Sequence, residues 1–195
     1  MSSALESIAQ AAARLVVDDG LEYGAAKRKA ARDLSRRGGR RSELPSNEAI
    51  EDEVRDYLAL FESDTQPSEL DAMRRLALHW MERLADFRPH LTGAVWRGTA
   101  TRRSTVHIEL YCDDPKAAEI GLLDRRIAFD PVGQADGPDL LRIEVPCAEL
   151  GESVTLFLHV LDRDDLRGGL KPDARGRTWR GDAPALQRLL RDATP

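Results

Sequence analysis

The chain has 195 residues, of which 42% are hydrophobic, and a net charge of −5. This length suits one ordinary domain, or a helical module joined to a small α/β domain. The acidic balance excludes a protein whose whole surface binds nucleic acid. No apolar run approaches the roughly 18 residues that a membrane-spanning helix requires, and the opening segment carries Glu6 and Arg14 instead of an export leader. We expect a cytoplasmic protein with no membrane association, in which Cys112 and Cys147 are reduced core thiols.

Helical spacing of apolar residues dominates the first 87 positions. Ser3 and Glu6 form a capping-box pattern that begins a first helix, and Asp18 to Gly20 ends it. Apolar residues recurring every three or four positions then predict amphipathic helices. These further helices are expected at about 23–34, 47–61 and 68–87.

A basic cluster lies between positions 27 and 41, where the only acid is Asp33, so the local balance is +7. Its members are Lys27, Arg28, Lys29, Arg32, Arg36, Arg37, Arg40 and Arg41. Such a cluster could bind a phosphate backbone and release about one counterion per contact. Because no aromatic residue is interleaved for base stacking, we favour a surface that is solvated or paired with the acidic segment 48–56. A nucleic-acid-associated or regulatory role stays an alternative.

Alternating apolar residues and turn signals predict strands in the second half of the chain. These strands are expected at about 104–112, 126–131, 140–146 and 154–160. Asp114 is the expected N-cap of a helix that begins at Pro115. The residues of this helix that we expect to face the core are Ala118, Ile120, Leu122 and Leu123.

Beyond Val160 the chain is polar and rich in glycine and arginine, and a last helix is expected at about 184–192. Trp179 lies within this polar loop, and we expect its ring to pack on the domain. Together these elements predict an α+β fold. A helical N-terminal region with a basic linker should occupy residues 1–66, and a mixed β-sheet domain with flanking helices should occupy residues 67–195.

The stretch from Gly93 to Ala100, which contains Arg97-Gly98-Thr99-Ala100, precedes a strand that begins Ser104-Thr105-Val106-His107-Ile108. This layout resembles the DNA polymerase beta-like nucleotidyltransferase superfamily. In that superfamily a Gly-Ser turn and an Arg-Gly-Thr-Ala stretch precede a strand written Ser-Asp-Ile-Asp-Leu. The resemblance implies a nucleotidyltransferase-like sheet and covers about 70 residues, from His90 to about Val160. Ala94 stands where the family turn has serine.

The two aspartates of that family strand would hold magnesium, and here Thr105 and His107 occupy their positions. Magnesium prefers hard oxygen ligands, whereas imidazole suits zinc, copper or nickel. A third carboxylate normally comes from a later strand, but the segment Val154 to Val160 has no acid. The resemblance therefore implies a degenerate metal site, with no catalytic residue and no cofactor expected.

The main hypothesis is a nucleotidyltransferase-fold protein without catalysis that binds a nucleotide or another phosphate ligand, or that serves as an interaction module. The expected nucleotide or anion-binding residues are Gly93, Ala94, Arg97, Gly98, Thr99 and Ser104. The Gly/Arg-rich loop could fold back and receive the anion near Arg97.

An active enzyme is the alternative, with a metal site shifted to His107 and Glu109, whose side chains should share one strand face with Thr105. It would use a divalent metal with a nucleoside triphosphate. A muramate–alanine ligase is disfavoured, because the chain has no phosphate loop ending in Gly-Lys-Ser or Gly-Lys-Thr. A substrate, a physiological partner and an oligomeric state do not follow from these patterns.

Overall fold

A computed structural model describes residues 4–36, 43–133, 139–167, 172–173 and 175–193 of the chain. Within them lie seven α-helices, two short 3-10 helices and one six-stranded mixed sheet, so the predicted α+β class is confirmed. Ser3 of the expected capping box lies outside the described residues, as do Arg37, Arg40 and Arg41 of the basic cluster. No helix in the described part of the chain has the length and apolar character needed to cross a membrane.

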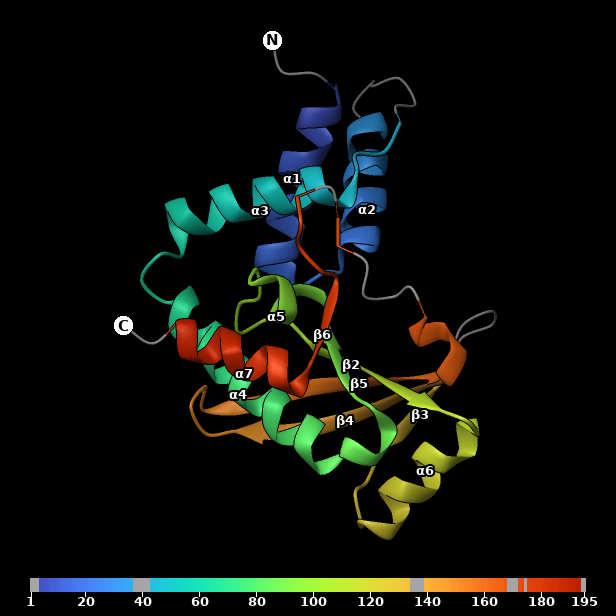
Figure 1. The fold of residues 1–195 in the computed structure, drawn as a ribbon. Helices are drawn as coiled ribbons and strands as arrows, with labels where there is room; N and C mark the ends of the chain where they lie inside the picture. Colours follow the sequence, from blue (N-terminus) through green and yellow to red (C-terminus); the bar gives the residue numbers. More distant parts are fainter. Residues whose placement is uncertain (1–3, 37–42, 134–138, 168–171, 174, 194–195) are drawn as a thin grey trace. The chain divides into compact units, whose positions relative to one another are not determined.

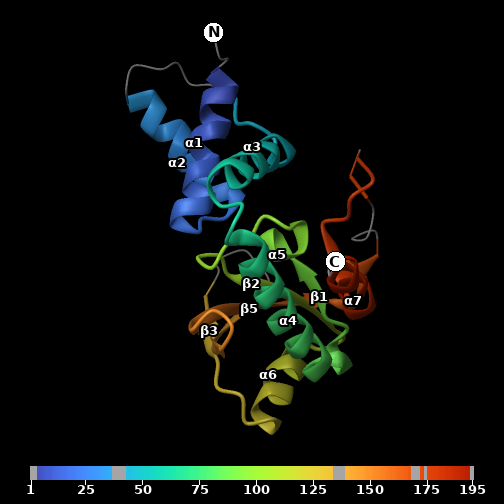
Figure 2. The ribbon, with the colours of Figure 1, turned by 90° about the vertical axis from the view of Figure 1, so that its left-hand side faces the viewer.

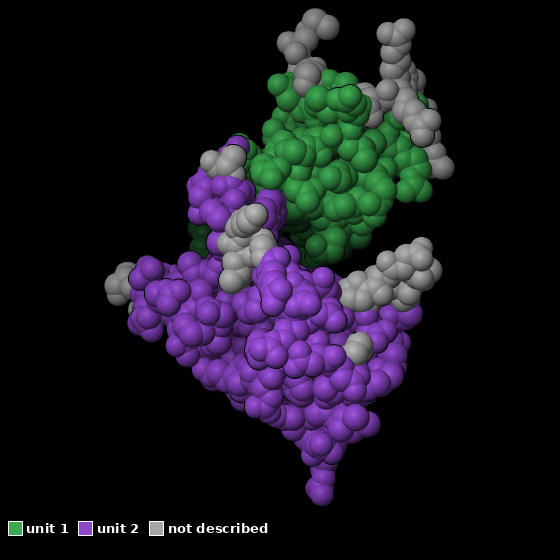
Figure 3. Space-filling view, turned by 45° about the vertical axis from the view of Figure 1, so that its right-hand side comes forward, with its two compact units in different colours: residues 1–68, 99–104 green, residues 69–98, 105–195 purple. Residues whose placement is uncertain are grey.

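The chain divides into two compact units (Figure 3). Unit 1 comprises residues 1–68 and 99–104, and unit 2 comprises residues 69–98 and 105–195. The first boundary falls two residues after the expected one. The structure also assigns the segment 99–104, which the sequence placed in the sheet domain, to the helical unit.

Unit 1 is built from α1 (Ala4–Asp19), α2 (Tyr23–Arg36) and α3 (Asn47–Phe61), and α1 contacts both other helices (Figures 1 and 2). The apolar stripes predicted from the spacing face one another and exclude water. The fully buried part of this core includes Ile8, Ala12, Val16, Ala26, Ala30, Ile50 and Val54. Ser46 caps α3, because its hydroxyl accepts a hydrogen bond from the backbone N–H of Ala49 at 3.1 Å.

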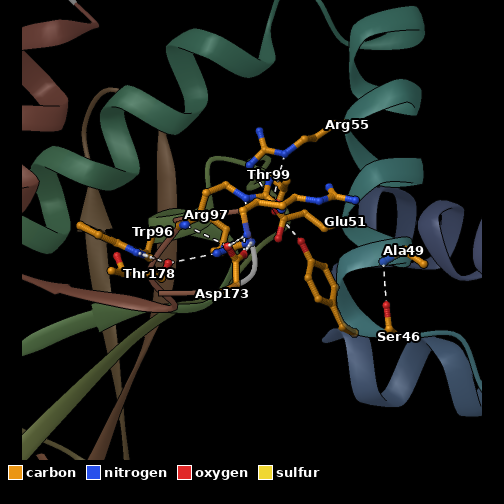
Figure 4. Close-up of polar contacts among 12 residues, drawn as sticks. Ser46, Ala49, Glu51, Arg55, Trp96, Arg97, Thr99, Asp173 and Thr178 are labelled. Atoms are coloured by element: carbon orange, nitrogen blue, oxygen red, sulfur yellow. Dashed lines mark hydrogen bonds and ion pairs between the residues drawn. The ribbon is translucent and has the colours of Figure 1, made fainter. Parts of the chain in front are cut away.

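Two cations of α2 have partners outside the acidic segment 48–56. Lys29 forms an ion pair with Asp19 at 3.1 Å, and Lys27 donates a hydrogen bond to the Asn47 side chain at 2.9 Å. Glu51 of the acidic segment instead pairs with Arg55 one turn along α3 at 2.8 Å (Figure 4). Arg28 and Arg32 are exposed, so α2 presents positive charge to solvent.

Unit 2 contains the sheet, whose strand order is β3-β4-β5-β2-β1-β6. The strands are β1 (His90–Thr92), β2 (Val106–Cys112), β3 (Asp130–Val132), β4 (Asp139–Cys147), β5 (Glu152–Asp162) and β6 (Arg180–Asp182). Only the β2–β5 pair is parallel within this sheet, and the other neighbours are antiparallel. Its helices are α4 (Gln66–Arg83), whose first three residues belong to unit 1, α5 (Gly93–Arg97), α6 (Pro115–Asp124) and α7 (Ala183–Asp192). Short 3-10 turns, η1 (Ala85–Phe87) and η2 (Arg163–Leu166), complete the unit.

One face of the sheet is apolar and buried, and the other is polar and half-buried. Val106, Ile108 and Leu110 of β2 are fully buried, as the alternation predicts. Leu156 and Leu158 of β5 lie opposite Val106 and Ile108 in register, so they extend the same apolar face. The polar face carries the intervening side chains of the same strands.

Helix α6 contacts β2 and β5 (Figure 1), and its sequence predicts its start better than its buried face. Asp114 is the N-cap, as expected, and accepts a hydrogen bond from the backbone N–H of Lys116 at 2.9 Å. The prediction that Ile120 and Leu123 face the core is wrong, because they are 54% and 63% exposed. The helix is short and only a narrow stripe of it meets the sheet, so the neighbouring apolar positions remain in solvent.

Two further differences concern short segments. The strand expected at 126–131 is only three residues long and begins at Asp130, after Arg126 with its positive φ of 55°. Strand β6 lies in the segment expected to be a loop, and it pairs with β1. Three residues centred on Gly181 are too few to show an alternation of apolar and polar side chains, so the sequence does not predict this strand.

Candidate functional site

The turn after β1 requires a glycine for its backbone conformation. Gly93 has a φ of 71°, a conformation that favours glycine, and it begins α5. A Cβ atom at Gly93 would lie 3.7 Å from the ring of His107, so the turn lies directly beside the polar face of β2. Gly98 ends α5 with a φ of 81°. The two glycines therefore bracket a five-residue helix that carries Arg97.

Arg97 is buried and already holds an anion (Figure 4). Its Nη2 atom lies 3.1 Å from the Asp173 carboxylate, and both side chains are at least 96% buried. Its Nη1 atom donates a hydrogen bond to the carbonyl oxygen of Thr178 at 3.0 Å. The ring of Trp179 lies 4.1 Å from the guanidinium carbon, which adds a cation–π contact. The Gly/Arg-rich loop thus folds back to Arg97, and it supplies the carboxylate itself.

Asp173 is held in its ionised form by several donors. Its Oδ1 atom accepts hydrogen bonds from the backbone N–H groups of Arg175 and Arg177, both at 2.9 Å. The Arg177 N–H is the largest cause of a pKa lowered below the ordinary aspartate value, and the Arg97 guanidinium adds to it. Asp173 is consequently a permanent anion at neutral pH.

Hydrogen bonds at Trp96 and Trp179 hold the same loop against α5 and β1. The Trp96 ring donates a hydrogen bond from Nε1 to the Thr178 carbonyl oxygen at 2.9 Å. The hydroxyl of Thr92 donates to the carbonyl oxygen of Trp179 at 3.0 Å. The Trp96 ring also fills the space where Gly181 lacks a side chain. The expected packing of Trp179 on the domain is therefore observed, as its contact with Arg97 shows.

The polar face of β2 begins with a chain of hydrogen bonds. The Thr105 hydroxyl and the His107 Nε2 atom are 2.8 Å apart, and His107 Nδ1 is 2.8 Å from His159 Nε2 on β5. The His107 ring also stacks on Phe157, with ring centres 5.3 Å apart. The two positions at which the resemblance expects aspartates therefore carry groups that bond to each other.

Further along the same face, Glu109 belongs to a different group. Tyr111 donates a hydrogen bond to its carboxylate at 2.7 Å, and the Arg180 guanidinium forms an ion pair with it at 2.7 Å. Burial, followed by the hydrogen bond to Glu109, raises the pKa of the Tyr111 phenol. Glu109 is thus neutralised by Arg180 from β6.

The described residues form no preformed site for a catalytic divalent cation. Among them, no group of three or more His, Cys, Asp or Glu side chains is placed to hold a metal ion. His107 bonds to Thr105 and His159, whereas Glu109 bonds to Tyr111 and Arg180. His107 and Glu109, which the alternative hypothesis of an active enzyme takes as metal ligands, therefore bond to separate sets of partners.

The expected anion-binding residues divide between the two units. Gly93, Ala94, Arg97 and Gly98 belong to unit 2, and Thr99 and Ser104 belong to unit 1. The Thr99 hydroxyl is 2.8 Å from the hydroxyl of Tyr23, and the Ser104 hydroxyl accepts a hydrogen bond from the Thr101 N–H at 3.0 Å. Both hydroxyls thus have local partners within the helical unit.

A separate pocket in unit 2 has a volume of about 400 Å³. It is lined by Arg88, Arg163, Asp164, Leu166 and Arg167. Arg163 pairs with Asp113 at 3.3 Å and Arg167 with Asp164 at 3.6 Å, and all four side chains are more than half exposed. Guanidinium groups are suited to phosphate, so this arginine pocket is a second place where an anion could bind.

Sequence reasoning missed Asp173, His159 and Arg180 as members of the site. The alternation of β5 places His159 on the polar face, but only the register with β2 brings it to His107. Asp173 and Arg180 lie in the segment interpreted as a loop, where no periodicity marks them. Comparison of the chain with protein-family models, curated proteins and solved structures finds no match.

Proposed function

We propose that unit 2 is a nucleotidyltransferase-like domain without metal-dependent catalysis that binds a phosphate-bearing ligand, such as a nucleotide, beside the Gly93 turn. The main support is the hydrogen-bonded pair of Thr105 and His107, which occupies the two positions where the resemblance expects magnesium-binding acids. Nucleotidyl transfer depends on divalent cations that clamp the attacking and leaving oxygens. A neutral hydroxyl bonded to an imidazole does not replace two carboxylates.

The arrangement around β2 supports the same proposal. A glycine turn at Gly93 and a short helix precede β2, and the later strand β5 lies beside β2 in parallel. The resemblance expects the third carboxylate on this later strand. His159 lies opposite Glu109 there, so the later strand contributes imidazole instead of acid.

Arg97 is the anion-recognising group in this proposal. Its guanidinium already binds a carboxylate oxygen and is stacked on the ring of Trp179, so the position accommodates an oxyanion. Asp173 would compete with the ligand for Arg97. We therefore expect wild-type protein to bind nucleotide weakly and a variant without this negative charge to bind it more tightly.

A thermal-shift titration with nucleoside triphosphates, with and without magnesium, tests the proposal. A ligand that binds only the folded protein raises its melting temperature. We expect a larger shift for Asp173→Asn than for wild type, with little dependence on magnesium. Asp86→Asn is the matched control, since Asp86 pairs with Arg125 in an exposed ion pair.

Two results would overturn the proposal. No shift for either wild type or Asp173→Asn would exclude nucleotide binding, and loss of the shift in Arg167→Ala would move the site to the arginine pocket. Magnesium-dependent consumption of nucleotide, abolished by Glu109→Ala, would instead support the active enzyme with a displaced metal site.

A further inference from the structure

The two histidines of the polar face lie on neighbouring parallel strands, with their ring nitrogens facing each other. His107 belongs to β2 and His159 to β5, and the register places His159 opposite Glu109, two residues beyond His107. His107 Nδ1 and His159 Nε2 are 2.8 Å apart, with ring centres separated by 5.1 Å. Two imidazole nitrogens at this distance either share one proton or both face one bound cation.

The outer hydrogen bond of His107 is compatible with the tautomer that a metal ligand needs. The Thr105 hydroxyl lies 2.8 Å from Nε2, so it can accept the Nε2–H proton. In that tautomer Nδ1 carries a lone pair that is directed toward His159. Histidines that bind metals commonly donate their second ring N–H to such an acceptor, which fixes the tautomer and the ring. The stacked Phe157 ring restrains the same imidazole further.

The separation of the two nitrogens is closer to that expected in a square-planar site than in a tetrahedral one. With metal–nitrogen bonds of about 2.0–2.1 Å, a nitrogen–nitrogen distance of 2.8 Å corresponds to a ligand–metal–ligand angle of about 85°. Adjacent ligands in square-planar or tetragonal copper(II) and nickel(II) sites subtend about 90°. Tetrahedral zinc would need the nitrogens about 3.4 Å apart.

We propose that His107 and His159 form a two-imidazole binding site for a divalent transition-metal ion of the copper(II) or nickel(II) class. Thr105 is a positioning residue that fixes the His107 tautomer. Within the described residues no third acidic, histidine or cysteine side chain joins the pair, so water or a bound ligand completes the coordination. The proposal does not rest on nucleotide binding, and the site differs from the His107/Glu109 pair because the charge of Glu109 is compensated by Arg180.

Titration of the full-length, tag-free protein with copper(II) and nickel(II) tests this site, with glycine present as a weak competing chelator. We expect one saturable equivalent and a rise in melting temperature. Electron paramagnetic resonance of the copper form should show hyperfine coupling to two imidazole nitrogens. This spectrum reads the ligands directly in the wild-type protein, so it does not depend on whether a variant folds.

Variants then identify the ligands. His159→Gln and His107→Gln should lose saturable binding and the two-nitrogen signal, whereas His79→Ala should keep both, since His79 is exposed on α4. Thr105→Val should keep both ligands but weaken binding by about 10- to 100-fold, which is the usual effect of removing an outer hydrogen bond.

Three results would contradict the two-histidine metal site. A wild-type protein that takes up no copper(II) or nickel(II) would show that the two rings only share a proton. Coupling to fewer than two imidazoles, or loss of binding in His79→Ala, would also overturn the proposal. None of these outcomes depends on the nucleotide titration, so the two proposals fail or succeed separately.

Discussion

At the scale of single residues, the ion pair between Arg97 and Asp173 is the feature that most constrains the site. Both groups are removed from water, which is costly unless each charge is paired and hydrogen-bonded. Here the carboxylate has two backbone donors and a guanidinium, and the guanidinium has a carbonyl and an aromatic ring as additional partners. Both charges are therefore paired and hydrogen-bonded. Removing either side chain would leave the other charge buried without its partner, at the full desolvation penalty.

Stability should consequently fall in acid because of Asp173. Its pKa in the folded protein is lower than the ordinary value of 3.8. Because the folded protein binds this proton less tightly than the unfolded chain, ionised Asp173 adds to the free energy of unfolding at pH values above 3.8. This contribution is lost as the pH falls from there through the folded-state pKa. Urea unfolding between pH 6 and pH 2 measures it. Asp173→Asn should be less stable at pH 6, and its stability should decline less in acid than that of wild type. An unchanged decline would contradict the assignment.

Cys112 should be an unreactive thiol in the folded protein. Burial, with the nearby Asp113 and Asp114 carboxylates, raises the pKa of this thiol, and the thiolate is the reactive form. Reaction with an aromatic disulfide reagent at pH 7.5 should be slow in the native state and fast in denaturant. Fast native labelling that Cys112→Ala removes would show that the residue is accessible.

At the scale of elements, the short strand β6 packs closely against the helix α5. Gly181 belongs to β6, and a Cβ atom there would overlap the ring of Trp96 on α5. The ring also binds the Thr178 carbonyl, so it cannot move aside without losing that hydrogen bond. A glycine without a positive φ is therefore required here by space and not by backbone conformation.

Replacing Gly181 should be costly for that steric reason. Gly181→Ala should lower the free energy of unfolding by about 1–3 kcal/mol, as overpacking in a filled interior does. Gly133→Ala is the matched control, because nothing lies within 4 Å of a Cβ atom at Gly133. Denaturant melts followed by tryptophan fluorescence compare the two. Equal stabilities of the two variants would show that Trp96 has room to shift.

At the scale of the whole molecule, the chain forms two units that each have their own apolar core. In unit 1 the core is made by helix stripes, including Ile50 and Val54 of α3. In unit 2 it is made by one face of the sheet, including Ile108 and Leu158. Proteins with separate cores commonly depart from a single two-state transition.

Core substitutions should therefore act within one unit. Ile50→Ala and Leu158→Ala should each cost about 2–5 kcal/mol, since both side chains are fully buried. Hydrogen exchange read by mass spectrometry should lose protection in α1 to α3 for the first variant and in the sheet for the second. Loss of protection in both units with either substitution would show that they unfold together.

The sequence alone determined the features that depend on near neighbours along the chain. The helical spacing of apolar residues predicted the bounds of α3, and the carboxylate before Pro115 predicted the N-cap of α6. The alternation of apolar residues predicted that Ile108 lies on the buried face of β2. Each of these patterns is set by the fixed periodicity of a helix or strand. The replacement of two expected acids by Thr105 and His107 is likewise visible in the sequence.

Only the tertiary structure decided which distant groups meet. His107 and His159 are 52 positions apart, and Arg97 and Asp173 are 76 apart. Their contacts follow from the parallel register of β2 with β5 and from the three-residue strand β6, which carries no periodic pattern. Local propensity acts over a few residues, whereas register and loop closure are fixed by the packing of the complete sheet. That packing gives the polar face its histidine pair and gives Arg97 its internal anion.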